Sequence, residues 1–274
     1  MTDAIKVSSE RVKNVTLKDF HLYGDIRNQT CVINGINLST SFDVPYDARQ
    51  TIKDVFIEEF TGTGLIVWGR GGSLIDNVQI LWTKKDGFDL NSWDSIIANC
   101  NAGSIQDEAV KIKGAGNRFT SCKGWWSTRG FTLNGNRNQL TLCEAQDCLN
   151  GGFEITEGYE NRLDACYVDG VGQRGENFRA DNIPAFVVTN DCGKNFISAT
   201  ITDRKEYHKD GTVDYALDLQ GGYDNEINLV VSQIKKGVMK TSLTTHNNTV
   251  KITGTDINNQ KINYSSLEID GSVS

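Results

Sequence analysis

Three charged side chains occupy equivalent positions in the sequence, each directly before a small residue and a short apolar segment: Asp86, Glu108 and Arg129. Asp107 stands beside Glu108. Two carboxylates that lie close together raise the pKa of one of them by like-charge repulsion, which produces a general acid near neutral pH. Paired carboxylates on either side of a sugar bond are the groups that glycoside hydrolysis requires. We therefore predict Asp86, Asp107 and Glu108 as catalytic residues.

Cationic and aromatic side chains near these acids are suited to holding a sugar. Arg and Lys can bind an acidic sugar or a phosphate, and an exposed indole can stack on a sugar ring. Because adjacent strand residues face opposite ways, we expect only one of Trp125 and Trp126 to serve as such a platform. Trp82 and Trp93 are suited either to stacking or to packing at turns. The predicted substrate-binding residues are Lys85, Asp89, Lys111, Trp126, Arg129, Glu154, Arg179, Tyr207 and His208.

Two other interpretations of the acids stay open. The first is a solvated surface ladder of alternating charges, which sheets commonly carry. The second is a Ca²⁺ site formed by Asp86, Asp89, Asp107 and Glu108, because oxygen ligands suit that ion, with Arg129 as the base of a lyase. The hydrolase interpretation requires no cofactor, and Ca²⁺ is the alternative. The cysteines and histidines have no spacing typical of a zinc or redox motif.

A repeat of 21–23 residues must position these side chains. In each unit a small residue is followed by an apolar, variable, apolar pattern, as in Gly130-Phe131-Thr132-Leu133 and Gly152-Phe153-Glu154-Ile155. This alternation predicts a short strand with one buried face, and stacked units of this length predict a solenoid. The expected fold is all-β: a single-stranded right-handed parallel β-helix of about 9–10 coils.

Stacking places like residues on like residues, so columns are expected. One interior column is Phe88, Val110, Phe131, Phe153, Phe186 and Leu217, and the outward column beside it is Asp89, Lys111, Thr132, Glu154, Val187 and Asp218. Cys100, Cys122, Cys143 and Cys166 form a third column, which we interpret as core packing rather than a disulfide framework. A fourth column is Asn117, Asn138, Asn161, Asn195, Asn225 and Asn248. We expect these amides to lie in a turn and to bond to the coils above and below.

With these columns, the sequence resembles the pectin-lyase-like superfamily of right-handed parallel β-helices, which includes pectate lyases, polygalacturonases and phage tailspikes. Lys84-Lys85-Asp86, Gln106-Asp107-Glu108 and Thr128-Arg129-Gly130 stand where polygalacturonases carry Asn-Thr-Asp, Gly-Asp-Asp and Gly-His-Gly. The acidic positions match, Arg129 replaces the His, and no Arg-Ile-Lys motif follows. The resemblance extends from Asn14-Val15-Thr16-Leu17 to about Thr253. The β-helix domain is predicted at residues 1–253, and residues 254–274 are expected to be a C-terminal cap or the start of a further segment.

The resemblance implies a tailspike-like depolymerase acting on a polysaccharide or a teichoic-acid-like glycan. It also implies a virion tail or extracellular location and a homotrimer. Because no Gly-Asp-Gly cap is present, we expect the chain to be part of a larger protein or its N-terminal end to be covered. The alternative is a receptor-binding β-helix without catalysis.

Composition restricts the partners. With 35 acidic and 28 basic side chains, the net charge is −7, which argues against a general nucleic-acid binder. No apolar run approaches the roughly 20 residues of a membrane span, and no signal peptide is recognisable. Two coils are enlarged, at residues 169–182 and 203–212, and we expect them to wall one end of a groove. Arg174, Arg179, Tyr207 and His208 lie in these enlarged coils.

Overall fold

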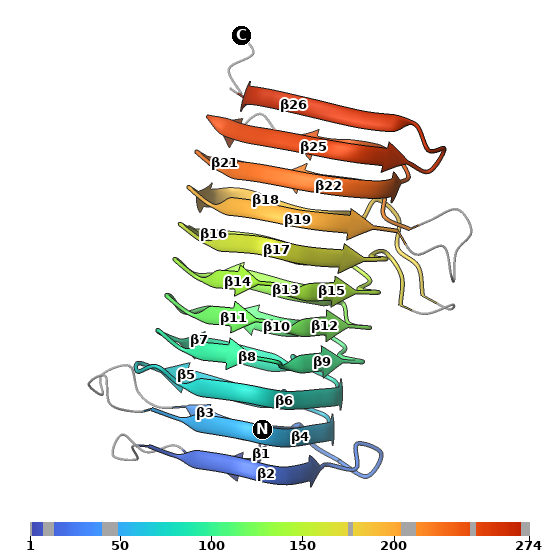
Figure 1. Ribbon diagram of the computed structural model, residues 1–274. Coiled ribbons are helices and arrows are strands. Elements are labelled where there is room, and N and C mark those ends of the chain that lie inside the picture. The colour runs from blue at the N-terminus through green and yellow to red at the C-terminus, as the bar shows by residue number, and fades with distance from the viewer. Residues whose placement is uncertain are drawn as a thin grey trace.

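The computed structural model describes residues 2–7, 14–39, 49–174, 178–203, 212–241 and 245–269. These residues form stacked coils of strand, with no helix among them, and successive coils rise along one axis (Figure 1). The predicted all-β parallel β-helix is confirmed. The described part of the chain holds no helix that is long and apolar enough to cross a membrane.

One long sheet, sheet A, is formed by one strand from each coil, paired in parallel. Two short strands, β21 (Gly222–Tyr223) and β24 (Thr245–His246), extend it. The main strands in order are β1 (Thr2–Lys6), β3 (Ile33–Ser39), β5 (Leu65–Gly69), β7 (Phe88–Ser92), β10 (Glu108–Ile112), β13 (Arg129–Asn134), β16 (Phe153–Tyr159), β18 (Pro184–Gly193), β20 (Tyr215–Leu219) and β23 (Gly237–Thr241).

The second sheet, sheet B, covers the other side of the core. In the middle coils its strands are divided in two by left-handed residues such as Asn99, with φ of 56°. Its strands are β2 (Thr16–Tyr23), β4 (Thr51–Phe60), β6 (Leu74–Thr83), β8 (Ile96–Ala98), β9 (Asn101–Gly103), β11 (Arg118–Thr120), β12 (Lys123–Trp125), β14 (Gln139–Thr141), β15 (Glu144–Gln146), β17 (Arg162–Asp169), β19 (Phe196–Thr202), β22 (Glu226–Ile234), β25 (Asn248–Asp256) and β26 (Lys261–Ile269).

The predicted columns are present in the strand register. Thr132 pairs with Lys111 on one side and Glu154 on the other, and Phe131 pairs with Val110 and Phe153. The Phe131 and Phe153 rings stack with centroids 4.8 Å apart, and Phe153 stacks on Phe186 at 5.1 Å. All six members of the interior column are at most 3% exposed. One apolar column therefore runs along the axis and fixes which residues of sheet A face outward.

The asparagine column is a continuous hydrogen-bonded ladder at the turn that leads from sheet A into sheet B. Each backbone N–H from Asn117 to Asn225 donates to the side-chain Oδ1 of the next asparagine. All six side chains are at most 1% exposed. The structural role predicted for this column is confirmed. The four cysteines of the third column are buried free thiols within the core, as the packing interpretation requires.

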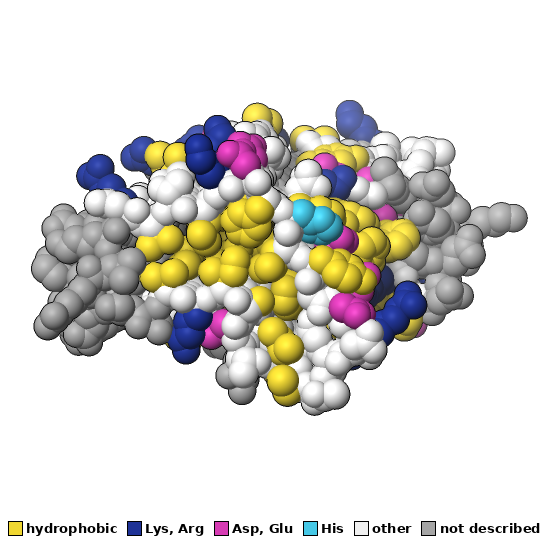
Figure 2. Space-filling model, turned by 90° about the horizontal axis from the view of Figure 1, so that it is seen from below, with side chains coloured by type: hydrophobic (Ala, Val, Ile, Leu, Met, Phe, Trp, Pro, Cys, Tyr) yellow, Lys and Arg dark blue, Asp and Glu magenta, His cyan; other side chains and the backbone are white. Residues whose placement is uncertain are grey.

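The two ends of the stack differ. At the C-terminal end, β26 pairs antiparallel with β25, and β25 runs to Asp256, past the predicted domain boundary at residue 253. At the N-terminal end, β1 and β2 lie at the ends of their sheets. Figure 2 shows apolar side chains gathered on this end, where Leu17, Phe20 and Ile33 are only partly buried against the core.

Candidate functional site

Asp86 and Glu108 meet where sheet A begins. Asp86 lies in the turn from β6 to β7, and Glu108 is the first residue of β10. The Glu108 backbone N–H donates to Asp86 Oδ1 at 3.3 Å. Lys111 Nζ lies 3.8 Å from Asp86 Oδ2 and 3.4 Å from Glu108 Oε2. The structure therefore brings together two predicted catalytic acids and one predicted cation, and we call these three residues the carboxyl pair and its lysine.

The two acids of the pair have opposite protonation tendencies. Burial raises the pKa of Asp86 to about 7, and a hydrogen bond with Glu108 adds to the rise. Burial also acts to raise the pKa of Glu108, but the hydrogen bond with Asp86 and the charge of Lys111 bring it below its ordinary value. The two groups titrate as a pair that holds one proton near neutral pH. The pair can therefore donate a proton at a pH where an ordinary carboxyl is fully ionised.

The shared proton predicts a pH-dependent stability that needs no substrate to measure. Because the pKa of Asp86 is raised from 3.8 to about 7 on folding, only the folded chain holds this proton between these two pH values. This stabilisation is present at low pH and is lost as the pH rises through about 7. Between pH 5 and pH 8, the wild-type free energy of unfolding is expected to fall by on the order of 2 kcal/mol more than that of Asp86→Asn.

Urea unfolding at the two pH values checks this expectation. The lowered pKa of Glu108 acts only at more acidic pH, so it leaves this window unchanged. Parallel pH curves for wild type and Asp86→Asn would contradict the shared proton.

The remaining predicted residues of this face divide into paired and unpaired side chains. Lys113 Nζ lies 3.0 Å from Asp89 Oδ1, and Arg129 forms an ion pair with Glu154. Arg129 Nη2 also donates to the Asn150 carbonyl at 3.3 Å. These charges satisfy one another across neighbouring coils, as the surface-ladder interpretation expects. Their role in substrate binding stays a prediction.

Asp107 and Lys85 lie in the adjoining turns, and neither side chain has an ion-pair or hydrogen-bond partner among the described residues. Asp107 is half-buried and Lys85 is exposed. Arg179 lies 3.9 Å from Asp181 in the first enlarged coil. Tyr207 and His208 lie outside the described residues.

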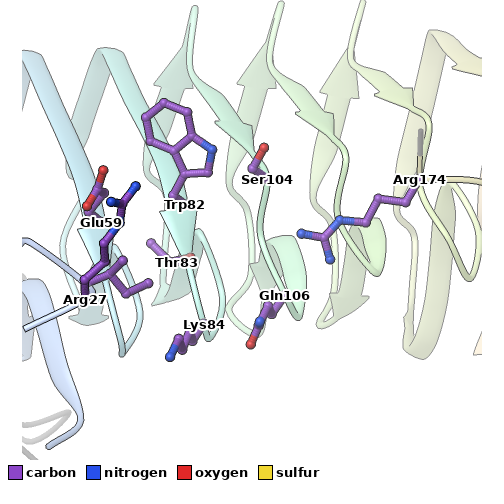
Figure 3. Close-up of a pocket in the computed structure, with 9 residues that line it drawn as sticks. Arg27, Glu59, Trp82, Thr83, Lys84, Ser104, Gln106 and Arg174 are labelled. Carbon is purple, nitrogen blue, oxygen red and sulfur yellow. The ribbon is translucent and has the colours of Figure 1, made fainter. Parts of the chain in front are cut away.

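A cavity of about 460 Å³ opens at the corner where sheet B turns toward sheet A (Figure 3). It lies beside the carboxyl pair along the chain, because Lys84 and Gln106 precede Asp86 and Glu108 by two residues. We call it the corner pocket, and it is lined by Ile26, Arg27, Glu59, Trp82, Thr83, Lys84, Ser104, Gln106 and Arg174. Arg174 comes from the first enlarged coil and points toward the pocket, so that coil contributes to a concave surface, as predicted.

Trp82 is held in an unusual backbone conformation at this corner. Its φ is 53° and its side chain is 48% exposed. A left-handed conformation is costly for a large residue, and such outliers often mark functional positions. Glu59 and Ser104 occupy the same corner of the neighbouring coils with φ of 60° and 56°. The left-handed corner therefore presents these three side chains along one edge of the pocket.

Sequence reasoning did not select Arg27 or Glu59. Glu59, Trp82 and Ser104 are separated by 23 and 22 residues, so the repeat itself carries the signal for Glu59. Arg27 lies in the turn after β2, outside any repeated motif, and no sequence signal points to it.

The expectation that Trp125 and Trp126 face opposite ways is wrong. Both line a second cavity of about 430 Å³ on sheet B, the tryptophan pocket, together with Gln79, Leu81, Asn101, Lys123, Gln146 and Asp147. The φ of 48° at Trp126 breaks the strand alternation, and the two rings meet edge to face at 5.8 Å. Trp126 Nε1 donates to Asp147 Oδ2 at 3.3 Å. Trp126 thus lies in a different pocket from the one that Trp82 lines.

The Trp125 indole lies across Gly103 of the preceding coil. A Cβ atom at Gly103 would stand 2.2 Å from Trp125 Cε2, so Gly103→Ala must displace the ring. We expect a loss of about 1–3 kcal/mol in the free energy of unfolding, measured with urea. In a Trp125→Ala background the same change is expected to be nearly neutral. An equal loss in both backgrounds would contradict this packing.

Metal binding by the four predicted acids is not favoured. Among the described residues, no group of three or more acidic, His or Cys side chains is arranged to hold a metal ion. Asp89 instead faces Lys113, and Asp86 and Glu108 face Lys111.

The β-helical fold of this chain is shared by several solved structures, in agreement with the fold expected from the sequence. The enzymatically active domain of tailspike protein 2 from bacteriophage CBA120 matches with a TM-score of 0.63 at 16% identity, over 83% of this chain and 37% of that one. ORF18 of Geobacillus virus E2 matches with a TM-score of 0.60 at 12% identity, over 94% of this chain and 53% of that one.

The DFA-IIIase from Arthrobacter chlorophenolicus A6, in complex with GF2, matches with a TM-score of 0.51 at 9% identity, over 85% of this chain and 69% of that one. No protein-family model and no curated protein matches the sequence. The chain spans about a third to a half of the length of the two viral proteins. At these identities the likeness concerns the fold.

Proposed function

We propose that this protein hydrolyses a polysaccharide, with the carboxyl pair as its proton donor. The observation that carries the proposal is the burial of Asp86 against Glu108 and Lys111, two residues from the corner pocket, which raises its pKa to about 7. A general acid works best when its pKa lies near the working pH. A concave pocket with an exposed indole supplies the other requirement, a place for a sugar ring.

We propose a different role for each of the three acids. Carboxylates on either side of a glycosidic bond stand about 5–9.5 Å apart, whereas Asp86 and Glu108 share a hydrogen bond. These two therefore act as one unit. Asp86 donates its proton to the leaving oxygen as the glycosidic C–O bond breaks. Glu108 and Lys111 hold the Asp86 side chain in position. Asp107, whose side chain has no partner among the described residues, accepts a proton from the attacking water. Asp107 then releases the proton it accepted to solvent, and Asp86 takes up one proton from solvent, so both acids return to their starting states.

The neighbours support a phage setting. One is a phage tailspike domain described as enzymatically active, and another is a viral open reading frame. We propose a surface glycan of a host cell as the substrate, a virion tail or extracellular location, and a trimer as the assembly.

One observation favours a second candidate, a recognition module without catalysis. Lys111 lies near both carboxyls, and Arg129 is paired with Glu154, so much of the predicted face satisfies its own charges. Such a surface can bind a glycan through the corner pocket alone.

A product assay separates these functions. The purified chain is incubated with bacterial and plant glycans and teichoic acids, and new reducing ends and unsaturated uronates are followed with and without chelator. Reducing ends that form regardless of chelator support hydrolysis. Unsaturated ends that disappear with chelator would replace it with the calcium-dependent lyase, and binding without product would leave the recognition module.

A further inference from the structure

The corner pocket concentrates positive charge on an acidic protein. Arg27, Lys84 and Arg174 line it, and none of them has an ion-pair partner among the described residues. Glu59 is the lone carboxylate in the lining, and its Oε2 accepts a hydrogen bond from the Tyr23 hydroxyl at 3.2 Å. The pocket therefore has an excess of two positive charges, while the whole chain has a net charge of −7.

Most cations elsewhere near sheet A have partners. Lys111, Lys113 and Arg129 each face a carboxylate on their own or a neighbouring coil. Lys85 also lacks a partner, but it does not line the corner pocket, where three unpaired cations line one cavity. Repeated strand register does not account for them, because Arg27 and Arg174 come from a turn and an enlarged coil rather than from a column.

Arg174 makes the strongest case for an anionic ligand. It is half-buried and extends from the first enlarged coil toward Trp82 and Ser104 (Figure 3). Burial lowers the pKa of its guanidinium, and no carboxylate among the described residues forms an ion pair with it. A partly desolvated and unpaired guanidinium favours a carboxylate or phosphate, which it can bind with two parallel hydrogen bonds.

Trp82 gives the pocket a flat surface between the cations. Its exposed indole stands between Glu59 and Ser104 at the left-handed corner, with Lys84 and Gln106 below it in the view of Figure 3. Ser104, with its small side chain, occupies the same corner of the next coil and also lines the pocket. An amphipathic ring such as a sugar can stack there while its charged group reaches the cations.

We propose that the corner pocket is a subsite for a sugar that carries an anionic group, with the ring on Trp82 and the anion held by Arg174, Lys84 and Arg27. The chemistry shared by the possible ligands is a carboxylate or phosphate attached to a sugar or polyol unit. This inference deepens the proposed function and rests on it for the identification of the ligand as a glycan. It makes the substrate an acidic polysaccharide or a teichoic-acid-like polymer rather than a neutral one.

Binding to the Asp86→Asn protein tests the subsite without turnover. The probes are a polyuronate, the same polymer after carboxyl reduction, a teichoic acid with a polyol-phosphate backbone, and neutral dextran. We expect binding of the polyuronate or the teichoic acid, weakened by added salt, and no comparable binding of the two neutral polymers. The two acidic probes distinguish carboxylate from phosphate as the recognised group. Failure of both acidic polymers to bind, or equal binding of the reduced polymer, overturns the proposal.

Variants of the lining locate the site. Arg174→Ala and Lys84→Ala are each expected to weaken binding of the acidic polymer about tenfold, and Trp82→Ala by a similar factor. The matched control is Arg162→Ala, an exposed arginine on sheet B that is paired with Asp164. Unchanged binding in Arg174→Ala and Lys84→Ala, with folding verified by thermal melting, would overturn the assignment.

The subsite and the hydrolysis can fail separately. If an acidic polymer binds to the corner pocket but the wild-type chain forms no product from it, the subsite proposal is supported and the proposed hydrolysis is contradicted. If Arg174→Ala forms product with the wild-type rate and KM, the proposed hydrolysis is supported and the subsite proposal is contradicted.

Discussion

Asp86→Asn is expected to reduce the rate of product formation at least about 100-fold, because an amide cannot donate the proton that the leaving oxygen requires. General acid catalysis typically contributes about 10²–10⁴-fold to a rate. Binding of the polymer is expected to change little, since the side chain keeps its size and lies outside the lining of the corner pocket. Initial rates of reducing-end formation and a separate binding isotherm measure the two effects.

The matched control is Asp218→Asn. Asp218 belongs to the outward column of sheet A that contains Asp89 and Lys111, pairs in register with Val187, and accepts a hydrogen bond from Gln220 at 3.1 Å. It is therefore a similar carboxylate, several coils from the carboxyl pair, and its loss should leave the rate unchanged. Equal rates for wild type and Asp86→Asn would remove Asp86 from the mechanism.

The pH profile follows from the same assignment. The proton on Asp86 is lost as the pH rises through about 7, so the wild-type rate is expected to fall tenfold per pH unit above that point. The profile belongs to the coupled pair, and Glu108→Gln is expected to shift the descending limb because it removes the hydrogen-bonded partner. A wild-type rate that stays constant from pH 6 to pH 9 would contradict a general acid with this pKa.

Regular spacing explains why the fold was predictable. Phe131 and Phe153 are 22 residues apart, so equal coils must place one ring on the other, and the observed centroid distance of 4.8 Å agrees with the spacing between paired strands. The same 22-residue spacing predicted that Thr132 and Glu154 lie side by side on the outer face, as the strand register shows. Wherever the repeat held, register followed from sequence alone.

The candidate site depended on features that a repeat does not specify. Strand alternation separated Trp125 from Trp126, but a left-handed residue at the corner brought both into one pocket. The meeting of Arg27 with Arg174 depends on the course of a turn and of an enlarged coil, for which no column exists. Proximity of Asp86 to Glu108 was predictable from the coil spacing, whereas the position of Lys111 between them depends on side-chain rotamers.

The asparagine ladder gives the largest expected effect on stability. Asn138 Oδ1 accepts from the backbone N–H and the Nδ2 of Asn117 at 3.1 and 3.0 Å, and Asn138 Nδ2 donates to the Gly114 carbonyl at 3.0 Å and to Asn161 Oδ1 at 3.2 Å. Asn138→Ala leaves these groups without partners in a site that is 0% exposed. Because each buried polar group left unsatisfied costs about 1–3 kcal/mol, we expect a loss of at least about 3 kcal/mol.

Urea unfolding of Asn138→Ala and of Asn228→Ala makes the comparison. Asn228 lies on the outer face of sheet B, where its amide donates to Glu226 at 3.1 Å, so its removal is expected to cost less than about 0.5 kcal/mol. A loss below about 1 kcal/mol for Asn138→Ala would mean that water replaces the amide and that the ladder is not the source of the stability of this turn.

Asn138→Asp separates the donating from the accepting half of the amide. A carboxylate still accepts from Asn117, but it cannot donate to Gly114 or to Asn161, and it would place a charge against Asn161 Oδ1. We therefore expect Asn138→Asp to be at least as unstable as Asn138→Ala at pH 7, and to recover partly at low pH, where the protonated acid donates one hydrogen bond. Since the ladder joins every coil from Asn117 to Asn248, a break at its middle weakens the stack on both sides of Asn138.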